Sequence, residues 1–259
     1  MKRRDSILIS IILLVPSLGR SQLPCPPTQF GVAGGTSSAS APCPAASGST
    51  YSTNFATAEN PLSEGGKWVD GKAAGINWNN PVSAFGKVYA SVRSGLSGSR
   101  YDDSIAHLSN GFIAFNANQY AQATVFRANG YSPTGGHEAE LLLHFQITAN
   151  SARGYEILWG VTGYLAIVRW NGPLGNYTPI YDPGPGSIPV PQDGDVLRAE
   201  VAGNIIKVYR NGVQVGQNVD VSSIGGQVWS SGQPGLGFWP VDSSTPENYG
   251  WKTFEAGSL

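Results

Sequence analysis

Two tight chain reversals within the segment 194–215 constrain the fold of this chain more than any other feature of its sequence. Asn211-Gly212 lies between β-branched runs and favours a two-residue hairpin turn, because both central residues of that turn need a positive φ. Gly203-Asn204 gives a similar reversal a few residues earlier. Side chains before it alternate between two faces: Leu197, Ala199 and Val201 on one, and Val196, Arg198 and Glu200 on the other. The segment therefore predicts three consecutive antiparallel strands.

From residue 51 onward, the rest of the chain also has the pattern of short strands separated by turns. Short apolar runs are separated by turn residues, with 34 Gly and 18 Pro in 259 residues, and no segment sustains the 3.6-residue period of a helix. The chain is therefore predicted to be all-β, a two-sheet antiparallel sandwich. Strands are expected at Thr53–Phe55, Lys67–Val69, Gly75–Trp78, Val88–Val92, Gly111–Asn116, Tyr120–Phe126, Glu138–Thr148, Gly154–Trp159, Tyr164–Trp170, Gly235–Trp239 and Trp251–Ala256, with a loop at Tyr181–Gln192.

The first residues have the pattern of an export signal. Lys2, Arg3 and Arg4 precede an apolar run, Ile7–Leu18, that is too short to span a bilayer. We expect residues 1–21 to be a cleaved signal peptide, although a retained anchor stays open. The protein is then expected to be secreted or at the cell surface, with no membrane span after cleavage.

Residues 22–50 are rich in Pro, Gly, Ser, Ala and Thr, which is the composition of a disordered linker, and the folded domain is expected at residues 51–259. Cys25 and Cys43 both fall in this linker, where a disulfide and two free thiols are equally compatible with an exported protein. The chain carries no basic patch interleaved with aromatic residues, so nucleic acid is not an expected partner. The sequence leaves the oligomeric state open.

Several short motifs in a fixed order resemble a known superfamily. They are Asn118-Gln-Tyr-Ala-Gln-Ala-Thr, Gly154-Tyr-Glu, Gly194-Asp-Val-Leu-Arg, Gly203-Asn, Val208-Tyr-Arg-Asn-Gly and Gly232-Gln-Pro-Gly-Leu-Gly. In this order they resemble the concanavalin A-like lectin/glucanase jelly rolls of exported bacterial proteins, close to the laminin G-like branch, over residues 55–254. The resemblance implies a jelly-roll sandwich. The resemblance does not identify an activity, because the superfamily includes lectins, glycosidases, polysaccharide lyases and adhesion modules.

The resemblance also allows a structural Ca²⁺ as a cofactor, and it implies no other. Loop carboxylates are the oxygen ligands that Ca²⁺ prefers. Residues of this type are Asp102, Asp103, Asp193, Asp195 and Asp220, none at a diagnostic spacing. Asp195 is expected instead to cap the turn before its strand.

The strand His137–Ile147 holds the strongest candidates for catalysis. Strand alternation would place Glu138, Glu140 and His144 on one face together with Leu142 and Gln146. Two carboxyl groups at this spacing are of the type that serves as the acid and the nucleophile of a glycosidase. The glucanases of the resembled superfamily use Glu-x-Asp-x-x-Glu, and here Leu143 stands where the last acid belongs. A solvated sheet face with a polar stripe is therefore the favoured interpretation.

An enzyme remains the alternative, with Glu138, Glu140, His144 and Glu156 near the cleft. A polysaccharide lyase needs a base and a cation, for which His144, Gln146 and Arg169 are the available residues, but the lyase motifs of the superfamily are absent.

Aromatic residues give a second set of candidates, for binding. Trp78 lies between the amides of Asn77 and Asn79, and a flat ring beside amide groups is suited to the face and hydroxyls of a sugar. Trp159, Arg169 and Trp170 complete the expected ligand-binding set, although a core position is the commoner fate of any single Trp. The leading prediction is a carbohydrate-binding, lectin-like module for a polysaccharide or glycan. The alternatives are a glycoside hydrolase or polysaccharide lyase on the same fold, and a structural or adhesive surface module.

Overall fold

The computed structural model describes residues 48–72, 78–91, 103–132, 137–149, 151–240 and 245–259. The predictions for the signal peptide, for most of the linker, for Cys25 and Cys43, and for Asn77 and Asp102 lie outside these residues.

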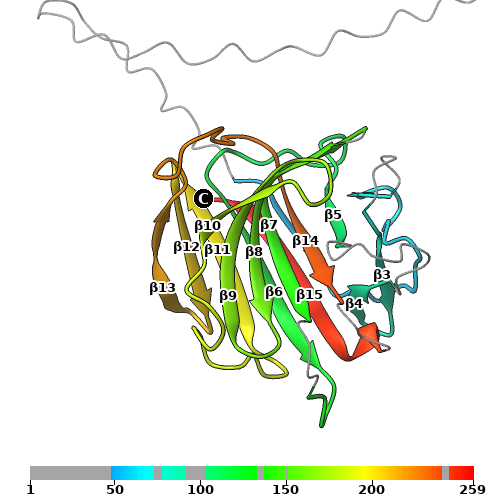
Figure 1. The fold of residues 1–259 in the computed structure, drawn as a ribbon. Coiled ribbons are helices and arrows are strands. Elements are labelled where there is room, and N and C mark those ends of the chain that lie inside the picture. Colours follow the sequence, from blue (N-terminus) through cyan, green and yellow to red (C-terminus); the bar gives the residue numbers. More distant parts are fainter. Residues whose placement is uncertain (1–47, 73–77, 92–102, 133–136, 150, 241–244) are drawn as a thin grey trace, which may run out of the picture. The chain divides into compact units, whose positions relative to one another are not determined.

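Within the described residues, fifteen strands form two sheets of antiparallel neighbours. The larger sheet has the order β13-β12-β11-β6-β15-β4-β3, with β1 also paired to β15, and Figure 1 shows β12 and β13 at one edge of the molecule and β3 and β4 at the other. Its strands are β1 (Thr50–Thr53), β3 (Pro81–Ala84), β4 (Lys87–Ala90), β6 (Gln119–Arg127), β11 (Val196–Ala202), β12 (Ile205–Arg210), β13 (Val213–Asp220) and β15 (Tyr249–Ser258).

The second sheet has the order β10-β9-β8-β7-β14-β5-β2. Its strands are β2 (Trp68–Asp70), β5 (Ser104–Leu108), β7 (Glu138–Thr148), β8 (Ser151–Gly160), β9 (Tyr164–Gly172), β10 (Tyr177–Tyr181) and β14 (Gln233–Trp239). A single 3₁₀ turn, Pro246–Asn248, precedes β15. The expected all-β fold, a two-sheet antiparallel sandwich, is confirmed.

The two sheets bury one continuous apolar core between them. Alternate residues of β7, such as Leu141 and Leu143, pack in the same cluster as Ala121 of β6 and Leu197 of β11 from the other sheet. This is the packing expected when two sheets each turn one face inward. The opposite face of the second sheet, which we call the outer face, carries a separate, smaller apolar cluster that includes Trp78, Leu142 and Trp170.

The twin hairpins of the segment 194–215 form as predicted. β11 and β12 are joined by Gly203-Asn204, and β12 and β13 by Asn211-Gly212. Asn211 has φ 51° and Gly212 has φ 78°, the positive values that the Asn-Gly turn requires. The predicted alternation also holds, since Leu197 is fully buried while Arg198 is half-buried.

Several details of the strand prediction differ from the structure. The first strand is Thr50–Thr53 where Thr53–Phe55 was expected, and Phe55 has φ 52°. The segment Gly111–Asn116 is not a strand, because it begins with a turn in which the N–H groups of Phe112 and Ile113 both donate to the carbonyl of Ser109. β3 and β10 were not expected, since each carries a proline (Pro81, Pro179) that marks a loop in sequence. β3 and β10 both lie at sheet edges, where a residue without an N–H is tolerated.

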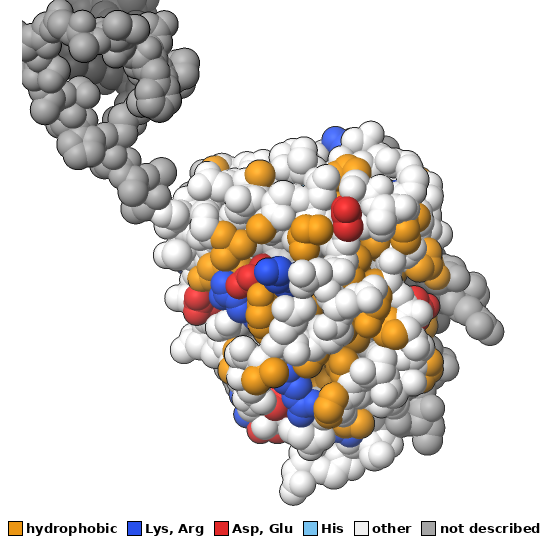
Figure 2. Space-filling view, turned by 90° about the vertical axis from the view of Figure 1, so that its left-hand side faces the viewer, with side chains coloured by type: hydrophobic (Ala, Val, Ile, Leu, Met, Phe, Trp, Pro, Cys, Tyr) orange, Lys and Arg blue, Asp and Glu red, His pale blue; other side chains and the backbone are white. Residues whose placement is uncertain are grey.

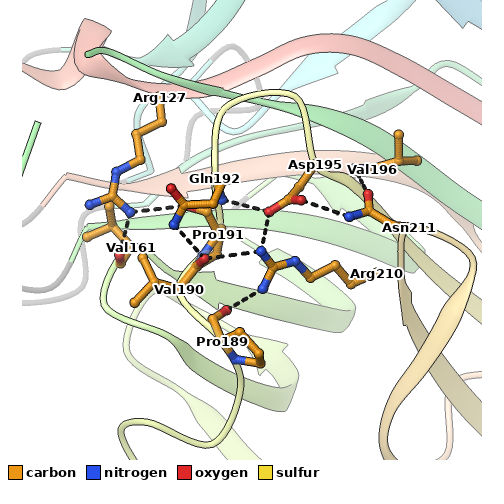
Figure 3. A network of polar contacts seen from close by, with 10 residues as sticks. All are labelled: Arg127, Val161, Pro189, Val190, Pro191, Gln192, Asp195, Val196, Arg210 and Asn211. Carbon is orange, nitrogen blue, oxygen red and sulfur yellow. Dashed lines mark hydrogen bonds and ion pairs between the residues drawn. The ribbon is translucent and has the colours of Figure 1, made fainter. Parts of the chain in front are cut away.

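Two arginines hold the proline-containing loop after β10 against the domain (Figure 3). Arg127 donates from Nη1 to the carbonyl of Pro191 at 3.0 Å. Arg210 donates to the carbonyl of Pro189 at 2.8 Å and to that of Val190 at 3.2 Å. Side chains from β6 and β12 therefore fix a loop that contributes no strand of its own.

Asp195 connects Arg210, one of these two arginines, to the turn between β12 and β13. Its carboxylate pairs with Arg210 at 2.6 Å, and it accepts hydrogen bonds from the backbone N–H of Gln192 at 2.6 Å and from Asn211 Nδ2 at 2.8 Å. The expectation that Asp195 caps the turn before β11 is confirmed.

Charged side chains on the side of the domain drawn in Figure 2 occur in small groups of mixed sign, with hydrophobic side chains between them. In the described part of the chain, no helix has both the length and the apolar character needed to cross a membrane.

Replacing Asp195 by Ala should destabilise the domain by about 2–3 kcal/mol, because it leaves the Arg210 guanidinium half-buried without its carboxylate. Asp193→Ala is the matched control, since Asp193 pairs with Lys252 at a site where the two side chains are 47% and 37% exposed. That change should cost less than about 1 kcal/mol. Urea unfolding of the three proteins measures both values, and equal losses would contradict the role given to Asp195.

Candidate functional site

Three glutamates lie together on the outer face of the second sheet. Glu138 and Glu140 alternate on β7 with the core residues Ala139 and Leu141. Leu142, the next outer position of β7, pairs directly with Glu156 of β8. Same-face neighbours on adjacent strands lie about 4.5–8 Å apart at Cβ, so the register places the three carboxyl groups in one neighbourhood.

A pocket of about 230 Å³ opens beside these glutamates. Its lining combines carboxyl groups with aromatic rings: Asp103, Glu138, Glu156, Leu158, Tyr164, Ala166, Val168, Trp170, Tyr177, Pro179, Asp182 and Trp239. Acids and flat rings converging on one concavity are the features expected of a binding or catalytic site.

The carboxyl groups at this site are buried. Glu138 is 8% exposed, Glu140 is fully buried and Glu156 is 3% exposed. The favoured interpretation of these residues as a solvated polar stripe is therefore wrong. The error arose because the strand pattern shows which residues share a face and does not show whether another segment covers that face.

Burial raises the pKa of all three glutamates. Desolvation is the main cause for Glu156, whose pKa rises to about 7. For Glu138 and Glu140, desolvation acts together with the charges of Glu156 and Asp103, and it raises both pKa values well above the usual range for a carboxyl group. The cluster therefore retains protons at a pH where an exposed glutamate has lost its own.

Glu156 and Glu140 are held in different ways. The indole Nε1 of Trp170 donates to the carboxyl group of Glu156. Both carboxyl oxygens of Glu140 have no hydrogen-bond partner in the described structure. The Glu140 carboxyl group lies against Gly237 of β14, where a Cβ atom would meet Oε2 at 2.1 Å, so a larger residue there would displace this carboxyl group.

His144 does not join this cluster. A β-bulge between Leu143 and Gln146 shifts the register of β7, and His144 has φ 50°. The bulge turns Phe145 onto the outer face, where it packs near Leu142, and moves His144 away from that face. The expectation that Glu138, Glu140, Leu142, His144 and Gln146 share a face therefore fails at His144 and at Gln146, since Phe145 and Ile147 take the outer positions.

His144 is instead fixed by backbone carbonyl groups. Its ring nitrogens contact the carbonyl oxygens of Trp229 at 2.8 Å and Ala117 at 2.6 Å. Arg169 also faces away from the pocket, and it donates to the carbonyl oxygen of Gly225 at 3.1 Å and to Asn171 Oδ1 at 3.1 Å. Neither His144 nor Arg169 lines the pocket, so the residues considered for a lyase do not belong to this site.

The expected ligand-binding residues divide between pocket and core. Trp170 lines the pocket, as the binding prediction requires. Trp159 is fully buried in the core between the sheets, so its ring is placed away from any ligand. Trp78 is 1% exposed and packs edge-on against Trp170, with ring centroids 4.4 Å apart. Trp78 therefore supports the pocket from behind its aromatic wall.

Asn79 faces a second concavity, of about 390 Å³, which Asn60, Asn80 and Tyr89 also line. Its backbone pairs with that of the strand start at Ser104, and its N–H donates to the carbonyl oxygen of Asp103 at 2.9 Å. Asn79 thereby positions Asp103, which lines the main pocket.

Sequence reasoning missed Asp103, Asp182 and Trp239 as members of the pocket. Asp103 had been considered only as a calcium ligand, and Asp182 and Trp239 follow β10 and end β14. Their positions, each at one end of a strand of the same sheet, were the available signal. Using that signal requires the strand order, which the sequence does not supply.

Among the described residues, no group of three or more His, Cys, Asp or Glu side chains is arranged to hold a metal ion. Two of the expected calcium ligands, Asp193 and Asp195, are ion-paired with Lys252 and Arg210. A structural Ca²⁺ stays an untested prediction.

No protein-family model matches the sequence, and no curated protein matches it either. Similar solved structures include the carbohydrate-binding module CBM66 from Bacillus subtilis, which is 14% identical over 76% of this chain and 95% of that one, with a TM-score of 0.46. A prokaryotic β-1,3-1,4-glucanase (lichenase) from a mouse hindgut metagenome is 12% identical over 80% and 95%, with a TM-score of 0.44. A β-porphyranase from the human gut bacterium Bacteroides plebeius is 10% identical over 83% and 94%, also with a TM-score of 0.44.

Likenesses this distant do not say what the present chain binds or catalyses. The laminin G-like branch stays a prediction.

The raised pKa of Glu156 should make the stability of the domain fall as the pH rises. The Glu156 carboxyl group ionises near pH 4.5 in the unfolded chain and near pH 7 in the folded one. The stability that this raised pKa contributes is therefore complete below about pH 4.5 and is lost as the pH rises to about 7. Glu156→Gln should reduce this decline, leaving the part due to Glu138 and Glu140, and should stabilise the domain at neutral pH by about 1–3 kcal/mol, since its amide oxygen still accepts from Trp170.

Urea unfolding across this pH range gives the measurement. Asp220→Asn is the control, because hydrogen bonds from Ser222 lower the pKa of this exposed aspartate and its titration falls below the range. A Glu156→Gln protein with the same pH profile as the wild type would contradict the assigned burial.

Proposed function

We propose that the protein binds a glycan, with one sugar unit seated in the outer-face pocket between β7, β8, β9 and β10. The observation that carries this proposal is the meeting of aromatic rings with a largely buried carboxyl group that lines the pocket. Glu138 lines the pocket, is 8% exposed, and makes no hydrogen bond or ion pair to the described residues.

Physical considerations support a sugar as the ligand. The rings of Trp170 and Tyr177 lie 5.2 Å apart on one wall, and an aromatic ring presents an apolar face to the C–H groups of a pyranose. A buried carboxyl group without a partner is costly, and a ligand hydroxyl would satisfy it. The export-signal pattern of residues 1–21 supports action outside the cytoplasm, on the cell surface or in the medium.

Trp239→Ala should weaken glycan binding about tenfold, because Trp239 lines the pocket and is only half-buried, so its loss removes stacking area with little effect on the core. Tyr209→Ala, on the exposed side of β12, is the control and should leave the affinity unchanged. A glycan array identifies a ligand and calorimetry compares the proteins. Failure of every glycan to bind would favour the structural or adhesive alternative.

Glycoside hydrolysis is a second candidate function, and the carboxyl groups of the pocket specifically favour it. A glycosidase requires one carboxyl group that keeps its proton near neutral pH and another within about 5–9.5 Å. Glu156 has a pKa of about 7, and Glu138 and Asp103 line the same pocket. Glu156 would protonate the leaving oxygen as the glycosidic bond breaks and water adds to the anomeric carbon, and Asp103, as the second carboxyl group, would accept the proton of that water.

Glu156→Gln should then abolish the release of reducing ends, by more than about 100-fold, while glycan affinity stays within about threefold. His144→Gln is the control for a buried polar group on the same sheet, and it should retain activity wherever the protein remains folded. Reducing-end assays and calorimetry on the same protein samples separate catalysis from binding. Binding without product from the wild type would leave the protein a lectin-like module.

A further inference from the structure

The second concavity, of about 390 Å³, lies beside the hairpin of β3 and β4, which forms one edge of the larger sheet (Figure 1). Three carboxamide groups line it, those of Asn60, Asn79 and Asn80, together with the ring of Tyr89. Among the described residues, none lines both this concavity and the outer-face pocket. The second concavity is therefore a separate candidate site.

Asn79 gives this concavity a buried polar group that the described protein does not satisfy. The Asn79 side chain is 7% exposed, and its Nδ2 has no hydrogen-bond partner in the described structure. A buried donor without an acceptor costs about 1–3 kcal/mol, and most buried polar groups are paired for this reason. Because the Asn79 side chain lines the concavity, rotation of its carboxamide would present Nδ2 to an acceptor oxygen of a ligand.

Hydrogen bonds hold the carboxamide-bearing segments in place before any ligand binds. The Asn79 N–H donates to the carbonyl oxygen of Asp103 at 2.9 Å, and the Asn79 carbonyl oxygen accepts from the Ile105 N–H at 3.2 Å. Asn80 Nδ2 donates to Asn60 Oδ1 at 2.9 Å. A site that is ordered in advance loses less conformational entropy when its ligand arrives.

The lining favours an uncharged ligand that carries hydroxyl groups. A carboxamide can both donate and accept, which matches the two roles of a hydroxyl. Val82 pairs with Tyr89 across the hairpin, so an aliphatic side chain and an aromatic ring give the concavity an apolar surface for the C–H groups of a sugar ring. One lysine, Lys72, and one glutamate, Glu247, line the concavity, so the formal charges of the described lining cancel.

We propose that the second concavity is a separate binding site for an uncharged sugar unit of a glycan. The Asn79 carboxamide donates to a hydroxyl oxygen of the sugar, and the sugar ring lies against Tyr89. This inference goes beyond the proposed function, because it uses none of the residues that line the outer-face pocket.

Titration with neutral hexasaccharides of glucose, xylose or galactose units, followed by ¹H–¹⁵N NMR, tests the inference. At least one hexasaccharide should shift the side-chain amide signals of Asn79 and Asn80 to saturation. Its affinity should change by less than about twofold between about 0.05 and 0.5 M salt, because an uncharged ligand has no charge for salt to screen. No shift of these signals, or a tenfold loss of affinity in salt, would overturn the inference.

Asn79→Asp replaces the donor by an acceptor of the same shape, so it should weaken binding, followed at the Asn80 signal, by at least about tenfold. Asn204→Asp is the control, because it makes the same change in the exposed turn between β11 and β12, and it should leave the affinity within about twofold. Tyr89→Ala, at a half-buried position, is a second variant in case Asn79→Asp does not fold, and it should cost about fivefold. Unchanged affinity in either folded variant would contradict the proposed contacts.

The same titration separates this inference from the proposed function. The indole signals of Trp170 and Trp239 report on the outer-face pocket, which both residues line. Shifts at these indoles with none at Asn79 and Asn80 would overturn the second site and leave the proposed function intact. Shifts at Asn79 and Asn80 alone would support the second site and contradict binding in the outer-face pocket.

Discussion

The register of β7 against its two neighbours determines where every polar group of the pocket lies. Pairing with β8 places Glu156 opposite Leu142, and pairing with β14 places Gly237 opposite Glu140. Gly237 leaves space for the Glu140 carboxyl group, which a larger residue would displace. A shift of one residue would turn the glutamates into the core and the core leucines outward, so the hydrophobic packing of the sandwich holds the acidic cluster in place.

The same strand shows how a local irregularity separates two sets of residues. Before the bulge at Leu143–Gln146, the outer face of β7 is acidic, and after it the same face carries Phe145 and Ile147. Trp78 packs in this apolar part and against Trp170. Burial and the charges of neighbouring acids raise these pKa values, and the apolar half of the face contributes to that burial.

The sequence allowed the fold to be predicted because its strongest signals are local. The Asn211-Gly212 turn and the alternation around Leu197 depend on neighbouring residues only, and both were correct. The structure brings Glu138, Glu140 and Glu156 together, as strand alternation and proximity in sequence led us to expect, while their catalytic role stays a prediction.

Burial, bulges and strand order could not be predicted from the sequence. The solvated-face interpretation failed because a separate segment, that of Trp78, packs over part of the outer face. His144 was misplaced because nothing in the letters Leu-Leu-His-Phe marks a bulge. Asp103, Asp182 and Trp239 meet only because β5, β10 and β14 belong to one sheet, an arrangement set by long-range pairing.

The hairpins of β11, β12 and β13 carry no candidate catalytic residue, but Arg210 of β12 helps to position the pocket. Asp182, at the start of the loop after β10, forms one side of the pocket, while Arg210 of β12 holds the other end of that loop at Pro189. One wall of the pocket is thus anchored on the opposite sheet. A fragment or chimaera that kept only the pocket-bearing sheet would lose that wall, so the recognition surface and the hairpin scaffold are expected to be inherited, exchanged and engineered as a unit.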